Sequence, residues 1–129
     1  MNDRRTVSTP SAPKAIGPYS QGVVALGFVY TAGQIALDPS SGAMVGGGDV
    51  ARETERCLEN VRAILTAAGT SLENVVRCDV FLADLADFGA MNEVYGRFFP
   101  SSAPARVTVQ AARLPKDARV EIAAIASLP

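Results

Sequence analysis

Two segments near the C-terminus show a two-residue alternation, and they constrain the fold more than any other part of the chain. In residues 105–112, one side carries Val107, Val109 and Ala111, and the other carries Arg106, Thr108, Gln110 and Ala112. In residues 120–126, one side carries Val120, Ile122, Ala124 and Ala126, and the other carries Glu121, Ala123 and Ile125. This period is typical of half-buried strands. The sequence therefore predicts two strands joined by a turn at residues 114–117.

Each of these strands carries one charged residue, Arg106 or Glu121, on the side opposite its aliphatic row. We expect both side chains on the same, less apolar face of one sheet. A guanidinium and a carboxylate placed there would suit binding of a small carboxylate together with proton transfer. The strand pattern alone leaves a surface ion pair as the alternative.

The clearest helix prediction covers residues 50–68. Asp49 suits the N-cap position, and Gly69 suits the position just after the C-terminus of the helix. Residues of the expected buried stripe recur at intervals of three and four, as in an amphipathic helix. They are Val50, Thr54, Cys57, Leu58, Val61, Ile64, Leu65 and Ala68. The polar residues Glu53 and Asn60 are expected between the members of this stripe.

The other elements follow from alternation, turn residues and helix-stop signals. They are a hairpin of residues 22–26 and 28–33, a strand over residues 75–83, and a helix over residues 85–99. Residues 1–21 are expected to form an irregular lead-in, because Pro10, Pro13 and Pro18 disfavour both helix and central strand. A continuation of the second strand through residues 34–37 is left open.

This order of elements predicts a single α+β domain over residues 1–129, with a mixed sheet. Right-handed crossovers would place both helices on one face of that sheet. The other face would then be bare, and it is expected to carry Arg106, Thr108 and Glu121. A bare face of mixed polarity indicates a partner surface, most simply another copy of the same chain.

The composition excludes several classes of function. The chain has no histidine, which removes Ser-His-Asp and Cys-His catalysis and the usual zinc-hydrolase motifs. Its net charge is −1 and it has no run of Lys and Arg, so nucleic acid is not an expected partner. No apolar run reaches membrane-spanning length and no signal-peptide pattern is present, so we expect a cytoplasmic protein. Cys57 and Cys78 form no C-x-x-C motif, and we expect no metal and no cofactor.

Five motifs occur in order along nearly the whole chain. They are I-G-P-Y-S-Q at residues 16–21, G-Q-I at residues 33–35, D-x-x-D-F-x-x-M-N-E-V-Y-x-x-F-F at residues 84–99, P-A-R-x-x-V at residues 104–109, and L-P-K-D-x-x-V-E-I at residues 114–122. Together they make the chain resemble the reactive intermediate deaminase family (RidA/YjgF, also called liver perchloric-acid-soluble protein).

The resemblance implies a chorismate-mutase-like fold and a barrel-like homotrimer with its sites at the subunit interfaces. It also implies hydrolysis of small 2-imino acids, such as 2-iminopropanoate and 2-iminobutanoate, to 2-keto acids and ammonia. A protonated imine carbon is already electrophilic, so an oriented substrate and a base-activated water suffice. Two alternatives are a non-catalytic protein that binds or senses small carboxylates such as 2-keto acids, and, more weakly, an endoribonuclease.

The resemblance also implies roles for individual residues. Arg106 would hold the substrate carboxylate, and Glu121 would position water. Tyr19 and Asn92 would line the site, and Gly33 would present its backbone N–H to the ligand. For Tyr19, packing on the hairpin is the alternative, and Asn92 could instead hold the loop that carries Tyr19.

Two positions depart from the pattern that is common in the family. Ala32 stands where many members have serine, which removes one hydroxyl group next to Gly33. Thr108 stands where many have cysteine, so a thiol-dependent role at that position is excluded. Both residues are expected in the wall of the site, where they would affect substrate preference.

Overall fold

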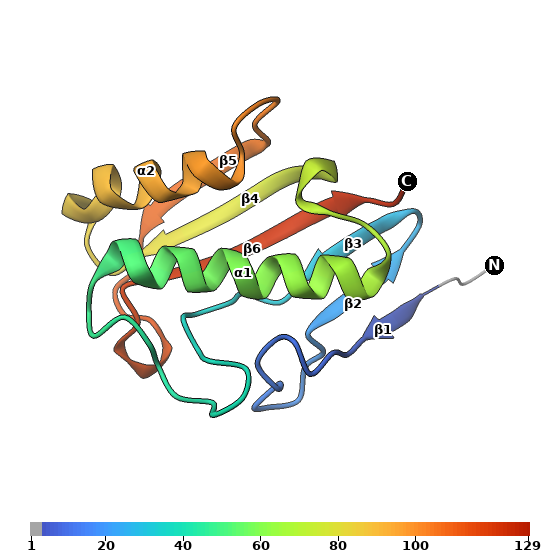
Figure 1. Cartoon of the computed structure of the whole chain (residues 1–129), viewed down its shortest axis with the longest axis horizontal. Helices are drawn as coiled ribbons and strands as arrows, with labels where there is room; N and C mark the ends of the chain where they lie inside the picture. Colours follow the sequence, from blue (N-terminus) through green and yellow to red (C-terminus); the bar gives the residue numbers. More distant parts are fainter. Residues whose placement is uncertain (1–3) are drawn as a thin grey trace.

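The computed structural model describes residues 4–129, which form two helices and one six-stranded sheet. The strands are β1 (Arg5–Val7), β2 (Gly22–Ala25), β3 (Phe28–Thr31), β4 (Val75–Leu82), β5 (Ala105–Gln110) and β6 (Val120–Ser127), and the helices are α1 (Val50–Ala68) and α2 (Phe88–Phe98). The strand order is β1-β2-β3-β6-β4-β5, with β4 and β5 parallel and the other pairs antiparallel. Both helices cover the same face (Figure 1), which confirms the predicted α+β architecture.

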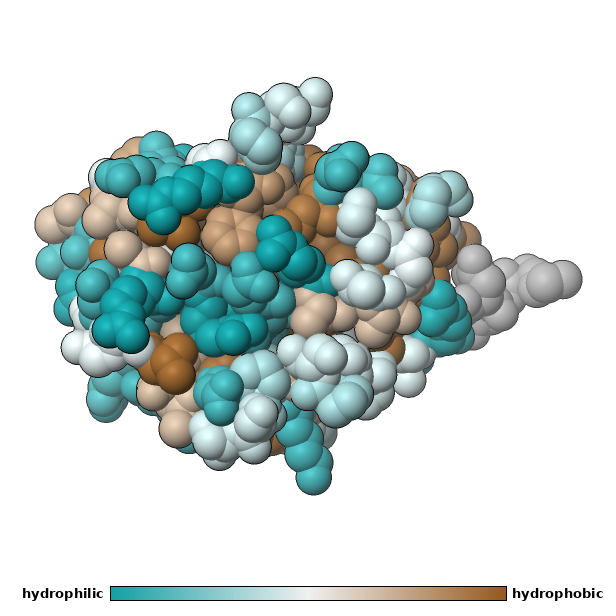
Figure 2. Space-filling model, in the orientation of Figure 1, coloured by the Kyte–Doolittle hydropathy of each residue, from teal (hydrophilic) through white to brown (hydrophobic). Residues whose placement is uncertain are grey.

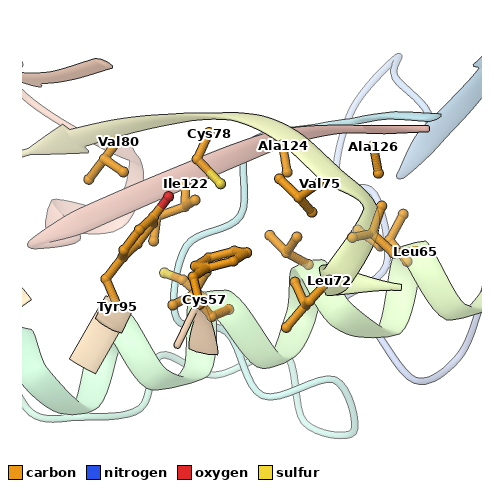
Figure 3. Close-up of a cluster of buried hydrophobic side chains, with 14 of the residues drawn as sticks. Cys57, Leu65, Leu72, Val75, Cys78, Val80, Tyr95, Ile122, Ala124 and Ala126 are labelled. Atoms are coloured by element: carbon orange, nitrogen blue, oxygen red, sulfur yellow. The ribbon is translucent and has the colours of Figure 1, made fainter. Parts of the chain in front are cut away.

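Helix α1 begins and ends where its capping residues predict. The Asp49 side chain accepts a hydrogen bond from the Ala51 N–H at 2.9 Å, and Gly69 adopts a left-handed conformation with φ of 94°. The predicted stripe of α1 is buried throughout. It packs against side chains of β4 and β6, among them Cys78 and Ile122 (Figure 3). Hydrophilic side chains cover the outer surface of α1 (Figure 2).

Two polar residues of α1 are also buried, contrary to their expected position between the apolar residues. Asn60 is fully buried, and its Nδ2 donates to the backbone oxygens of Ile35 and Leu37 at 3.2 and 3.0 Å. Its Oδ1 accepts from Arg56 Nε at 3.1 Å. Because every hydrogen-bonding atom of its amide has a role, Asn60 ties the irregular segment after β3 to the helix.

Glu53 is the second buried polar residue, with 2% of its surface exposed. Its carboxylate accepts a hydrogen bond from the backbone N–H of Arg119 at 2.9 Å, and Arg119 in turn pairs with Asp87. Burial raises the pKa of Glu53, and the Arg119 N–H partly offsets this effect. Glu53 thereby connects α1 to the start of β6.

Two segments differ from their expected structure. Residues 5–7 of the expected irregular lead-in form β1, which pairs with β2 so that Val7 lies opposite Gly22. Three residues are too few to show a period, so only their pairing with β2 reveals the strand. Residues 34–37 do not continue β3, because only isolated bridges from Gln34 to Ile122 and from Leu37 to Met44 form there.

None of the helices within residues 4–129 is long and apolar enough to cross a membrane.

The expected side-chain directions of β5 are wrong. In the parallel pairing with β4, Arg106 lies opposite Cys78 and Thr108 lies opposite Val80. Cys78 and Val80 are fully buried beneath the helices, so Arg106 and Thr108 point to the helix-covered face. Glu121 points the other way, as its neighbours Val120 and Ile122 occupy the core. Arg106 and Glu121 therefore lie on opposite faces of the sheet.

The face away from the helices is uncovered and more apolar than expected. Its exposed side chains include Phe28 and Tyr30 of β3 and Val107 and Val109 of β5, each with 36–43% of its surface exposed. Apolar side chains that stay exposed on an uncovered sheet face indicate an interface. The aliphatic row of β5 therefore belongs to a surface that one copy of the chain leaves open.

Candidate functional site

A cavity of about 360 Å³ lies where the chain leaves β3, and we call it the Glu121 pocket. Three segments distant in sequence line it, namely the loop before β2, the segment after β3, and the start of β6 with the turn that precedes it. The lining residues are Pro13, Lys14, Ile16, Tyr19, Ala32, Gly33, Gln34, Ile35, Leu37, Pro115 and Glu121. The structure thus brings together four of the predicted site residues: Tyr19, Ala32, Gly33 and Glu121.

Glu121 and Gly33 are in direct contact in this pocket. A Cβ atom built on Gly33 would lie 2.1 Å from Glu121 Oε2, so a side chain at this position would displace the carboxylate. Gly33 is therefore required for space. Burial raises the pKa of Glu121, because its carboxylate is half-buried beside apolar surface. A carboxylate with a raised pKa is a stronger base, which suits proton abstraction from water.

The loop that carries Tyr19 is held by Gln21, which is buried. The side-chain amide of Gln21 donates to the backbone oxygens of Ala12 and Pro13 at 3.2 and 2.8 Å and accepts from the Thr9 N–H at 2.7 Å. Half of the Tyr19 surface is exposed, and its hydroxyl accepts from the Ile16 N–H at 3.3 Å. Tyr19 therefore stands at the pocket wall on a fixed loop.

Arg106 lies in a second cluster, between β5 and α2. Its Nη1 donates to Asn92 Oδ1 at 2.6 Å, and its guanidinium lies 4.7 Å from the Tyr95 ring centroid and 5.4 Å from that of Phe88. Such cation–π contacts orient a guanidinium without neutralising its charge. Within residues 4–129, no acidic side chain forms an ion pair with Arg106. Its charge is therefore free for an external carboxylate. Asn92 holds Arg106, and among the described residues no hydrogen bond joins Asn92 to the loop that carries Tyr19.

Near Arg106, the Thr108 hydroxyl is buried without a hydrogen-bond partner among the described residues, and the buried Tyr95 hydroxyl lies beside the Cys78 thiol. The pKa of Tyr95 is raised, chiefly by burial and further by the neighbouring Cys78 thiol. Figure 3 shows the Tyr95 hydroxyl directed toward the sheet. Buried polar groups are nearly always satisfied, so an unsatisfied Thr108 hydroxyl beside a free guanidinium is consistent with a site completed by a ligand or a second chain.

The Glu121 pocket and the Arg106 cluster do not meet within one chain. Arg106 lies opposite Cys78 and Glu121 opposite Phe81, which is three residues, or roughly 10 Å, further along β4. The two side chains also occupy opposite faces of the sheet. The expectation of one shared face is therefore wrong, and a single site that uses both residues needs two copies of the chain.

Three residues that support the two clusters were not predicted from the sequence to have this role. Gln21 ends the I-G-P-Y-S-Q motif, and Asn60 interrupts the apolar stripe of α1, so each gave a weak signal. Tyr95 is expected as an ordinary member of the α2 stripe, and nothing in the sequence indicates its contact with Arg106.

No cluster of three or more histidine, cysteine, aspartate or glutamate side chains suited to a metal ion occurs in the described part of the chain.

Comparison with known proteins places the chain among closely similar sequences. The profile of the family described as endoribonuclease L-PSP matches residues 9–128. The human 2-iminobutanoate/2-iminopropanoate deaminase is 51% identical over 123 residues, covering 95% of this chain and 89% of the human protein. A RutC family protein of Pyrococcus horikoshii is 50% identical, covering 95% and 97%. The crystal structure of E. coli TdcF with bound serine superposes with a TM-score of 0.92 at 44% identity, covering 97% of this chain and 98% of TdcF.

Proposed function

This chain belongs to the endoribonuclease L-PSP family, and from that premise we propose that it hydrolyses small 2-imino acids to 2-keto acids and ammonia. The observation that carries the proposal is the Glu121 carboxylate, held against Gly33 in a half-buried pocket with its pKa raised. The name of the human relative supports the same reaction. A binding protein for small carboxylates would have no need of a base at this position.

In the proposed reaction, Glu121 takes a proton from a water molecule while that water adds to the carbon of the protonated imine. The resulting carbinolamine loses ammonia and becomes the 2-keto acid, so each imine consumes one water. Arg106 binds the substrate carboxylate in a bidentate manner, which an ammonium group cannot do. Tyr19 and the Gly33 N–H orient the substrate, and Ala32 leaves the adjoining wall without a hydroxyl group.

We further propose a homotrimer in which Arg106 of one subunit faces the Glu121 pocket of the next. Two observations support this assembly: Arg106 and Glu121 lie on opposite faces of the sheet, and the open face exposes Val107 and Val109. Burial of these side chains against a second copy would remove apolar surface from water.

The direct test couples the protein to an amino-acid oxidase or to threonine dehydratase, which release imines into solution. The protein should accelerate loss of the imine above its spontaneous hydrolysis. If the imine decays at the same rate with and without the protein, the proposed activity is wrong.

Gly33→Ala is expected to lower imine turnover by roughly two orders of magnitude, because even a displacement of about 1 Å at a catalytic group can have that effect. The added methyl group would occupy the place of Glu121 Oε2. Initial rates measure the loss, and a thermal melt verifies folding. The matched control is Gly96→Ala on α2, where an added Cβ meets no atom within 4 Å, and it should retain full activity. Normal turnover by a folded Gly33→Ala protein would contradict the role of this contact.

Sedimentation equilibrium is expected to give three times the mass of the chain at micromolar concentration. Mixed trimers test the shared site more sharply. Arg106→Ala chains and Glu121→Gln chains, each inactive alone, should regain part of the activity after joint refolding, because some interfaces then combine an intact Arg106 with an intact Glu121. Failure of these mixed trimers to recover any turnover would mean that the two residues do not act across an interface.

The second candidate is a protein that binds small carboxylates without turnover. The observation in its favour is the serine bound in the crystal structure of E. coli TdcF. Calorimetry with pyruvate and 2-oxobutanoate would detect binding whether or not turnover occurs.

A further inference from the structure

A second cavity, of about 300 Å³, adjoins the Glu121 pocket, and we call it the lysine groove. It shares four lining residues with that pocket, namely Pro13, Lys14, Ile16 and Leu37. The rest of its wall consists of Pro39, Ser40, Ser41, Gly42 and Lys116. Lys14 and Lys116 are the charged residues of this wall, and both are exposed. The groove is therefore a positively charged extension of a pocket whose own carboxylate is Glu121.

The acidic residues near the lysine groove do not neutralise these two lysines. The Asp38 carboxylate accepts hydrogen bonds from the backbone N–H and the hydroxyl of Ser41, at 3.0 and 2.8 Å. Asp117 pairs with Arg113 at 3.1 Å. Within residues 4–129, the ion pairs all use arginine side chains. Both ammonium groups are thus available to an anion that enters the groove.

The turn that carries Lys116 has a defined conformation. Lys116 and Asp117 both adopt left-handed backbone angles, with φ of 56° and 54°. The N–H groups of Asp117 and Ala118 donate to the backbone oxygens of Leu114 and Pro115 at 3.2 and 3.1 Å. Left-handed conformations are unfavourable for residues with a side chain, and they persist where surrounding contacts impose them. The turn therefore places Lys116 at the groove while Pro115 contacts the Glu121 pocket.

We propose that the lysine groove is a subsite for a second carboxylate, carried at the far end of a substrate whose imine carbon lies in the Glu121 pocket. The inference rests on the proposed function and gives it a substrate class, imino acids with an acidic side chain, such as the imine of glutamate. Lys14 lines both cavities, and Lys116 lies only at the outer one. Two ammonium groups facing one carboxylate favour it over an apolar tail of the same length.

Binding is tested with 2-oxoglutarate and 2-oxopentanoate, which have equal chain lengths and differ in the terminal carboxylate. Calorimetry should show 2-oxoglutarate binding about tenfold more tightly, as expected from two partly exposed charge pairs. Lys116→Gln, at the lysine that lines the outer cavity alone, should reduce this difference and leave 2-oxopentanoate binding unchanged. Arg52→Gln removes an equal charge from the exposed side of α1, outside the groove, and should change neither affinity.

Turnover of the imines of glutamate and norvaline separates this inference from the proposed function. Hydrolysis of both imines without a preference for that of glutamate would overturn the subsite and leave the activity intact. Hydrolysis of neither, with 2-oxoglutarate still preferred in a lysine-dependent manner, would overturn the activity and support the subsite. If Lys14→Gln weakens both keto acids equally, Lys14 holds the common carboxylate and the subsite is wrong.

Discussion

Arg106→Ala is expected to abolish imine turnover and to weaken binding of pyruvate and 2-oxobutanoate. The guanidinium has no acidic partner among the described residues, and Asn92 and the Tyr95 ring hold it in place. Loss of a charge-assisted bidentate contact costs about 3 kcal/mol, or roughly a hundredfold in Kd. Calorimetry measures the affinity and a coupled oxidase assay measures the rate. Arg106→Lys should recover little, because an ammonium group can neither form the bidentate contact nor match the planar stacking.

The matched control for this variant is Arg97→Ala. Arg97 lies on α2, pairs with Glu93 at 3.3 Å and is 63% exposed, so its removal changes the net charge equally without touching the cluster. It should leave keto-acid affinity unchanged. Normal keto-acid binding by Arg106→Ala would mean that the substrate carboxylate is held elsewhere.

The regular elements are predictable because their signals are local. The caps Asp49 and Gly69 and the apolar stripe between them determine α1 without reference to the rest of the chain. Strand β1 has no such local signal, because its three residues gain their conformation from pairing with β2. Elements supported by their own periodicity were thus expected correctly, and the one that depends on a distant partner was missed.

The direction of the β5 side chains shows a different limit of the sequence. Assigning the aliphatic row of Val107 and Val109 to the core assumes that one chain buries its own apolar residues. In the structure these residues face the open side, and Arg106 takes the helix side because Phe88 and Tyr95 provide aromatic surface for it. A strand whose aliphatic row stays exposed on one copy of the chain reverses the usual assignment.

The residues of the candidate site also divide into those that the sequence predicts and those that it does not. Tyr19, Gly33 and Glu121 come from motifs that a family resemblance can identify, Ala32 adjoins one of these motifs, and all four residues meet in one pocket. The residues that hold the pocket walls act through hydrogen bonds to distant backbone atoms. Asn60, for example, reaches across 25 residues to the Ile35 oxygen, and no local pattern predicts such a contact.

Glu121→Gln is expected to lower imine hydrolysis by roughly two orders of magnitude or more, because the amide cannot accept the proton of water. The substitution conserves size, so the Gly33 contact and the fold should persist. Affinity for 2-oxobutanoate should hold or rise slightly, since the keto acid carries a negative charge that the carboxylate repels. Parallel measurements of rate and affinity therefore separate a catalytic base from a group that only shapes the pocket.

The pH dependence of the rate gives a second test of Glu121 as the catalytic base. Burial raises the pKa of Glu121 above its ordinary value of 4.5, and the base must be ionised to act. In the wild-type protein, kcat/KM should therefore fall as the pH drops through this raised pKa. The fall in kcat/KM should match the fraction of Glu121 that is protonated. Glu121→Gln has no group to titrate there, so its low residual rate should lack this acid limb once the ionisation of the imine is allowed for. An identical acid limb in both proteins, or unchanged hydrolysis by the variant, would show that Glu121 is structural and that another group activates water.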